Sequence, residues 1–153
     1  MLSFWKILAT SGGAGYSPVA PGTAGALVAS AVAFLLQHYV NTSLYTWILI
    51  ALIVVFTILG ILATNQVEPA WGKDPSRVVI DESVGQWIAY LFIPFGLTNL
   101  ILGFVLFRLF DIWKPLGIRK MEQLKGGYGV MFDDVLAGVY ANIVLQLLVT
   151  FIT

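Results

Sequence analysis

The residues of this sequence that could do chemistry are concentrated in four short motifs. These are GGAGYSPVAPGTAG (12–25), DESVGQW (81–87), FRLFDIWKP (107–115) and GGYGVMFDDVLAG (126–138). Seven charged residues lie in the last three motifs: Asp81, Glu82, Arg108, Asp111, Lys114, Asp133 and Asp134. Carboxylates are the ligands that Mg²⁺ prefers, whereas Arg and Lys side chains bind phosphate oxygens. This combination indicates metal-assisted chemistry on a phosphate group.

Histidine and cysteine do not contribute to these motifs. The sequence has no cysteine, and its single histidine, His38, lies in an apolar stretch away from them. Oxygen ligands without Cys or His favour Mg²⁺ over Zn²⁺. We predict a Mg²⁺ site drawn from five carboxylates: Asp81, Glu82, Asp111, Asp133 and Asp134. Arg108 and Lys114 are predicted to bind phosphate, together with Ser17 and Thr23, which lie where a glycine-rich motif leads into a helix N-terminus that attracts anions.

Each of these features also has a purely structural explanation. Acidic residues at helix N-termini are favourable caps, and Gly and Pro commonly precede a helix. Arg108 and Asp111 are three residues apart and could form a local ion pair. Asp111 is harder to explain, because the dipole opposes a negative charge near the C-terminal end of a predicted helix. Adjacent helical residues point about 100° apart, so one member of each acidic pair, 81–82 and 133–134, is expected to face a shared centre.

The composition indicates a membrane protein and gives no case for nucleic-acid binding. Of the 153 residues, 59% are hydrophobic and 10% are charged, whereas about one quarter of a soluble domain is charged. The formal net charge is zero, so no basic surface for nucleic acid is expected. No linker or low-complexity stretch divides the chain, and we expect a single domain over residues 1–153.

We predict an all-α, polytopic membrane bundle of about five helices. Two short apolar runs within 83–107 are separated by Pro94, Phe95 and Gly96, and they are expected to form a helical hairpin. A bent or re-entrant element, or one crossing that gives four spans, is the alternative. The longer runs could each span a bilayer core of about 30 Å. The five predicted helices are 22–40, 44–64, 83–94, 97–107 and 135–153.

The distribution of charge predicts the orientation of the bundle. Five spans place all eight Lys and Arg residues on one side, which the positive-inside rule makes cytoplasmic. Four spans would split them between the two faces. His38 and Thr153 are then expected on the opposite side. Gly85 and Gly138 each follow an acidic residue by four positions, and we expect them to let helices approach closely.

With these four motifs in this order, the chain resembles the bacterial phosphatidylglycerophosphatase A family. Two positions depart from the family pattern, Ala26 where serine is common and Gly117 where proline is common; neither removes a charged group. The resemblance implies a Mg²⁺-dependent enzyme of the bacterial cytoplasmic membrane, acting at its cytoplasmic face in phospholipid biosynthesis. Its substrate would be the phospholipid phosphatidylglycerophosphate, which loses its terminal phosphate to give phosphatidylglycerol. By matching position, the family's charged motif residues correspond to all seven charged residues named above. Of these we predict five to be catalytic: Asp81, Asp111, Asp134, Arg108 and Lys114.

Two other classes of protein compete with this interpretation. A non-enzymatic ion or small-molecule transporter could use intramembrane carboxylates as an ion path, but here the charges gather at one surface. A lipid-headgroup transferase would need a nucleotide-recognition motif, and the sequence contains none. A water nucleophile and an aspartyl-phosphate intermediate both remain open, as do the number of metal ions and the oligomeric state.

Overall fold

The computed structural model describes residues 1–152, apart from the side chain of Leu2, so the expectation for Thr153 lies outside the described residues. All regular secondary structure among the described residues is helical, with no β-strand, which confirms the all-α part of the predicted fold class. Seven α-helices and one short 3₁₀ helix make up these residues: α1 (Leu2–Ala9), η1 (Ala14–Tyr16), α2 (Pro21–Tyr39), α3 (Thr42–Trp71), α4 (Ile80–Ala89), α5 (Leu97–Trp113), α6 (Ile118–Met121) and α7 (Gly127–Ile152).

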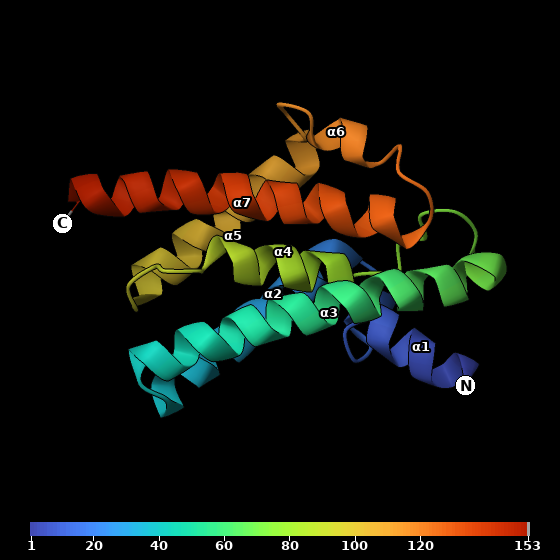
Figure 1. Cartoon of the computed structure of the whole chain (residues 1–153), viewed down its shortest axis with the longest axis horizontal. Coiled ribbons are helices and arrows are strands. Elements are labelled where there is room, and N and C mark those ends of the chain that lie inside the picture. The colour runs from blue at the N-terminus through green and yellow to red at the C-terminus, as the bar shows by residue number, and fades with distance from the viewer. Residues whose placement is uncertain (153) are drawn as a thin grey trace.

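The long helices run up and down between two ends of the bundle (Figure 1). Helices α2, α4 and α7 begin at the end where α3 and α5 finish, and the connections 72–79 and 114–126 lie at that same end. The turn predicted around Pro94–Gly96 is confirmed, because α4 and α5 are separate helices joined by residues 90–96. The three motifs that carry charge therefore meet at one end of the bundle.

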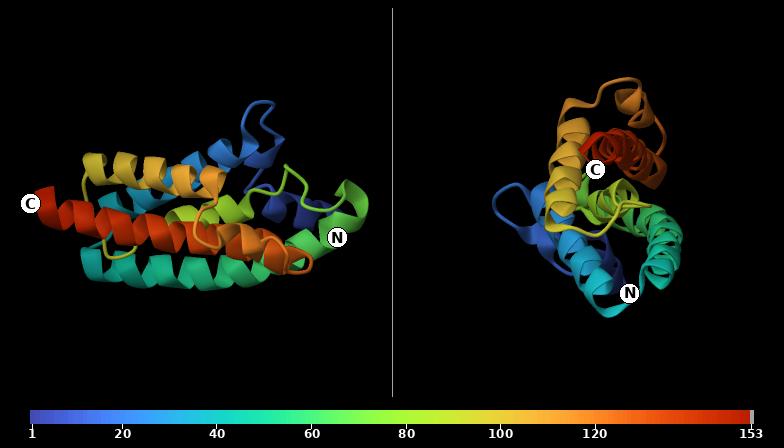
Figure 2. Two further views of the ribbon diagram at one scale, coloured as in Figure 1. Left: turned by 90° about the horizontal axis from the view of Figure 1, so that it is seen from above. Right: turned by 90° about the vertical axis from the view of Figure 1, so that its left-hand side faces the viewer.

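Helix α4 lies in the centre of the bundle and is too short to cross a membrane. It packs against α2, α3, α5 and α7, as the end-on view of Figure 2 shows, and nine of its ten residues are buried. Ten residues give a length of about 15 Å. The prediction of a helix over 83–94 is wrong at its C-terminal end, because α4 ends at Ala89. The side-chain amide of Asn142 in α7 donates to the carbonyls of Ala89 and Leu91 at 3.1 and 2.7 Å. It thereby gives hydrogen-bond partners to carbonyls that the end of α4 leaves free.

Helix α7 begins eight residues before the predicted position 135, at Gly127. Asn65 of α3 explains the difference, because its side-chain oxygen accepts a hydrogen bond of 2.8 Å from the Gly127 amide. Gly126, at φ 57°, makes the turn that precedes the helix. Asp133 and Asp134 are consequently inside α7, and their predicted position at its N-terminus is wrong.

Two of the described helices are long and apolar enough to cross a membrane, α3 and α7. Only 17% of the apolar window of α3 and 28% of that of α7 is buried inside the bundle, so both present most of these surfaces outward. A core helix of a soluble protein would have most of this surface covered. Each of the five predicted helices has a counterpart in the structure, but five membrane spans are not confirmed, because only α3 and α7 among the described helices meet the requirements for a span.

Candidate active site

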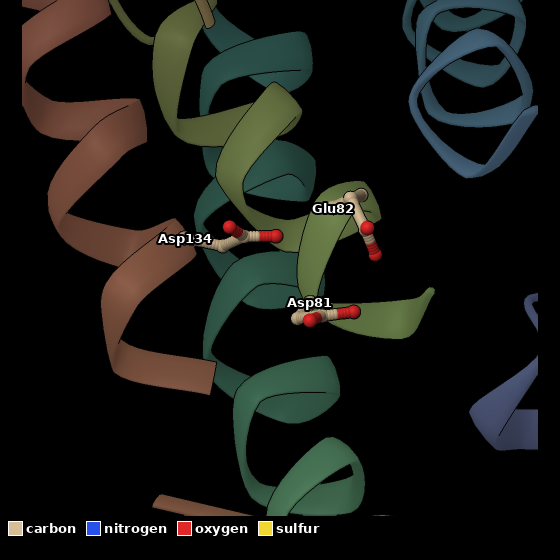
Figure 3. Close-up of side chains that lie close together, drawn as sticks. All are labelled: Asp81, Glu82 and Asp134. Atoms are coloured by element: carbon tan, nitrogen blue, oxygen red, sulfur yellow. The ribbon is translucent and has the colours of Figure 1, made fainter. Parts of the chain in front are cut away.

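Three carboxylates from two helices meet at the start of α4. Asp81 and Glu82 lie in its first turn, and Asp134 reaches them from the second turn of α7 (Figure 3). One ligand oxygen from each lies within 4.8 Å of the other two. Asp81 is 8% and Asp134 is 2% exposed. Each of the three has a buried oxygen, Oδ1, Oε2 and Oδ2 respectively, with no hydrogen-bond partner among the described residues.

Glycines on the two helices bring these carboxylates together. A Cβ on Gly85 of α4 would lie 2.6 Å from the Asp134 carbonyl oxygen, and a Cβ on Gly138 of α7 would collide with the Gly85 carbonyl. Neither position can carry a side chain without moving α4 from α7. The predicted role of these two glycines in close helix approach is confirmed.

Burial and mutual repulsion dominate the electrostatics at the start of α4. Burial raises the pKa of Asp81, and the charge of Glu82 raises it further. Burial also raises the pKa of Glu82. Buried oxygens that lack partners and repel one another are the environment that a bound cation relieves. These three carboxylates are therefore the residues placed to hold a divalent cation with oxygen ligands.

Arg108 and Asp111 form an ion pair on the last turns of α5. Their side chains are 16% and 11% exposed, so the pair is largely removed from water. Gly22, in the first turn of α2, lies against this pair, and a Cβ there would come within 3.2 Å of an Arg108 nitrogen and collide with Glu82. The Arg108 Nε group is buried and has no hydrogen-bond partner among the described residues, so it is free to donate to a ligand.

Lys114 lies outside α5, as the following Pro115 predicts, with a left-handed backbone at φ 52°. Its amine donates to Asp133 at 2.6 Å and also to Glu122, in the segment after α6. Burial lowers the pKa of Lys114, but the two carboxylates raise it by more, so its pKa lies above the ordinary value and the amine stays charged.

The adjacent acidic pairs behave differently. Asp134 joins the three-carboxylate cluster while Asp133 turns toward Lys114, so the expected separation of this pair is confirmed. The same expectation is wrong for Asp81 and Glu82, because the longer Glu side chain lets both reach the cluster. Of the five carboxylates predicted to bind metal, three form this cluster, and the other two, Asp111 and Asp133, are ion-paired; their role as metal ligands stays a prediction.

All seven predicted charged residues line one cavity of about 270 Å³. Its remaining walls come from the start of α2 (20–22) and from four residues of the 72–79 connection: Asp74, Pro75, Ser76 and Val78. Ser17 and Thr23 are not among the lining residues, and the Ser17 hydroxyl donates to the Val19 carbonyl. The geometry therefore gives no support to their predicted role in binding phosphate.

Sequence reasoning missed three contributors to the site. Gly22 lies in the glycine-rich motif, and its place in the first turn of a helix that begins at the charged end could have drawn attention to it. Asp74 and Glu122 lie in connections with no recognisable motif. No local pattern singles them out, because their proximity to the cavity depends on how the connections fold over the bundle.

The fold and the site define a helical protein with two candidate membrane helices and an open acidic cavity at one end of the bundle. The chain belongs to the phosphatidylglycerophosphatase A family, which it matches over residues 7–149. The family name describes a phosphatase that hydrolyses a phosphate monoester. All four motifs, which suggested this family from sequence, contribute to the walls of the cavity: the last three supply its seven predicted charged residues and the first supplies residues 20–22.

Relatives of the chain differ in the substrate that their names give. A Bacteroides thetaiotaomicron protein with the provisional name phosphatidylinositol-3-phosphatase is 52% identical over 147 residues, covering 94% of this chain and 92% of that protein. Phosphatidylglycerophosphatase A of Escherichia coli is 39% identical over 142 residues, or 88% of this chain and 77% of the relative. The Haemophilus influenzae protein of the same name is 36% identical over 146 residues, or 91% and 85%. No solved structure matches the chain.

Proposed function

We propose that this protein is a Mg²⁺-dependent membrane phosphatase that converts phosphatidylglycerophosphate to phosphatidylglycerol and inorganic phosphate in phospholipid biosynthesis. The observation that carries the proposal is the single cavity lined by all seven charged residues of the three motifs. A phosphate monoester needs cationic groups around its oxygens, and the cavity supplies Arg108 and Lys114. Membership of the phosphatidylglycerophosphatase A family supports the choice of reaction.

The donor set in the cavity fits Mg²⁺. Asp81, Glu82 and Asp134 offer only carboxylate oxygens, and each has an oxygen without a partner among the described residues. Six carboxylates, Asp74 included, outnumber the two basic side chains in the cavity, so an anionic phosphate would be repelled unless a cation were bound. When bound there, Mg²⁺ supplies positive charge next to the phosphate oxygens and orients the reacting groups.

The basic side chains stabilise the charge that develops on the phosphate in the transition state. Asp111 holds Arg108 by one end of the guanidinium, which leaves Nε to donate to a phosphate oxygen. Asp133 and Glu122 hold the Lys114 amine in the same way. Because the carboxylates fix both cations before substrate arrives, little reorganisation is needed during the reaction.

We infer that the cavity faces the cytoplasmic side of a bacterial cytoplasmic membrane. The basic residues of the connections 72–79 and 114–126 lie at the cavity end of the bundle, and the positive-inside rule assigns such an end to the cytoplasm. The outward apolar surfaces of α3 and α7 support insertion in lipid. A phosphate at headgroup level would then be within reach of the cavity.

A second candidate substrate is phosphatidylinositol 3-phosphate. The provisional name of the Bacteroides thetaiotaomicron protein, at 52% identity, favours it. Both lipids carry a phosphate monoester beyond a phosphodiester, so the catalytic groups would be the same. The two candidates differ in the group between the phosphates, and direct comparison of hydrolysis rates separates them.

Phosphate release from phosphatidylglycerophosphate in detergent micelles tests the proposal. We expect release that is abolished by a chelator and restored by Mg²⁺. Arg108→Gln should lower the rate at least about 10²-fold, as for loss of a group that stabilises transition-state charge. Arg119→Gln is the matched control, because Arg119 is exposed and does not line the cavity. Release that is insensitive to the chelator and to Arg108→Gln would refute the proposal.

A further inference from the structure

A second hollow adjoins the cavity and has no role in the reaction described so far. Its volume is about 350 Å³, and its walls come from α3, α7 and the connections 72–79 and 114–126. Asp74 and Asp133 line both spaces, so the two are neighbours with a common wall. Its polar lining residues include Thr64, Glu68, Lys73, Asp74, Glu122 and Asp133.

Thr64 points to a ligand in this second hollow. It is 1% exposed, and its hydroxyl has no hydrogen-bond partner among the described residues. Thr46 and Thr57, on the same helix, each donate to the carbonyl four residues earlier, at 3.0 and 2.6 Å. A buried hydroxyl without a partner costs stability, and a bound hydroxyl-bearing group would satisfy it.

The charges around the second hollow select the kind of ligand. Four carboxylates and one lysine line it, so a second phosphate monoester would be repelled. Carboxylates accept hydrogen bonds from hydroxyl groups, and Lys73 can pair with a single negative charge. The lining therefore suits a hydroxyl-bearing carbon skeleton attached to one phosphodiester.

We propose that the second hollow is the headgroup subsite of the enzyme. It would bind the hydroxyl-bearing group between the lipid phosphodiester and the terminal phosphate, with Thr64 and the carboxylates on the hydroxyls and Lys73 on the phosphodiester. This inference rests on the proposed function, because the terminal phosphate must then occupy the adjoining cavity. Phosphatidylglycerophosphate and phosphatidylinositol 3-phosphate both contain such a group, whereas phosphatidate does not.

The position of the hollow agrees with a lipid substrate. Its walls include residues of α3 and α7, the two helices that could cross a membrane. Both helices present apolar surface outward, so acyl chains could remain in lipid beside them while the headgroup enters the protein. The hollow also shares a wall with the cavity, so the group next to the terminal phosphate could occupy it while that phosphate lies in the cavity.

Substrate selectivity tests the inference. For wild type and variants, kcat/KM would be measured in mixed micelles for phosphatidylglycerophosphate, phosphatidylinositol 3-phosphate and phosphatidate. We expect Thr64→Val to lower the selectivity for a headgroup-bearing lipid over phosphatidate by about three- to tenfold, as for loss of one hydrogen bond. Lys73→Gln should lower it by about threefold or more. The lipid whose kcat/KM falls relative to that of phosphatidate carries the headgroup that the hollow binds.

Matched variants separate this effect from a general one. Thr57→Val removes a hydroxyl from the same helix outside the hollow, and Lys120→Gln removes an exposed charge elsewhere; both should keep the wild-type selectivity. Thermal stability of Thr64→Val should not fall, since the lost hydroxyl has no partner among the described residues. Unchanged selectivity in both hollow variants, or a wild-type preference for phosphatidate, would overturn the subsite while the phosphatase activity stands. Absence of phosphate release from every lipid would instead overturn the proposed function and the subsite with it.

Discussion

Replacement of Asp134 by Asn separates a metal-binding carboxylate from a structural one. Asp134 lies in the cluster with Asp81 and Glu82, whereas its neighbour Asp133 pairs with Lys114. The amide has nearly the same shape as the carboxylate but no charge. We therefore expect Asp134→Asn to lower phosphate release by at least about 10²-fold at saturating Mg²⁺, with the fold retained.

The effect on stability should change sign with the metal. The three ligand oxygens lie within 4.8 Å of one another, and two ionised carboxylates at that limit repel by about 3.5 kcal/mol at an effective dielectric constant of about 20. Relaxation and water reduce this value, so the variant should gain about 1 kcal/mol in chelator, or about 2–4 °C in Tm. Wild-type protein at about 100 times its Kd for Mg²⁺ gains about 2.7 kcal/mol on binding. If Asp134→Asn weakens Mg²⁺ binding tenfold, the variant gains only about 1.4 kcal/mol at the same Mg²⁺ concentration. The greater stability that it has in chelator is then lost.

Thermal unfolding in detergent, with chelator and with Mg²⁺, measures both effects without relying on activity. Asp133→Asn is the matched control, because it alters the adjacent residue and leaves the three-carboxylate cluster intact. It should lower Tm in both conditions, since Lys114 loses a buried partner, and should keep the Mg²⁺-dependent increase. An Asp134→Asn protein with the same Mg²⁺-dependent increase as wild type would show that the cluster does not bind the metal.

Three further predictions follow from the packing and the charges. Asp111→Asn should lower phosphate release at least about 10²-fold and also lower Tm, because a largely buried guanidinium loses its charged partner. Gly85→Ala should cost about 1–3 kcal/mol in the free energy of unfolding and reduce activity, whereas Gly96→Ala, whose added Cβ meets nothing closer than 3.9 Å, should do neither. Cysteine labelling with a membrane-impermeant reagent in intact cells should modify a cysteine introduced at His38 and not one at Lys73; labelling at Lys73 would contradict the cytoplasmic assignment.

The helical architecture was predictable because apolar runs are long and breakers are few. The starts of α2 and α5 lie within one residue of the apolar runs that predicted them, and Pro94–Gly96 separates α4 from α5. The start of α7 was not predictable in this way. Glycines there indicated a connection, and only the side chain of Asn65, more than 60 residues earlier, stabilises the helical form.

The membership of the site was more predictable than its internal arrangement. Charged residues in an apolar chain are costly unless used, and the motifs around seven of them drew attention to residues that all line the cavity. Which carboxylates join the three-carboxylate cluster and which form ion pairs depends on the rotation of α7 relative to α4 and α5. Glu122 and Thr64 belong to no motif, and their roles follow from contacts that only the folded chain creates.

The hairpin of α4 and α5 explains why acids and bases sort as they do at this site. An antiparallel pair places the N-terminus of one helix beside the C-terminus of the other, and the two ends carry opposite partial charges. Asp81 and Glu82 lie at the positive end of α4, whereas Lys114 lies at the negative end of α5, directly after its last residue; Arg108 lies before the last turn of α5. Both dipoles therefore stabilise the charges beside them before any ligand binds.

Asp111 is the exception to this arrangement, since its negative charge lies on the last turn of α5. Its ion pair with Arg108 offsets the unfavourable dipole and fixes the guanidinium with Nε free. A carboxylate retained at an unfavourable end of a helix is thus accounted for by the cation that it positions. The same reasoning applies to Asp133, which holds Lys114 beyond the end of α5 and keeps its amine at the cavity.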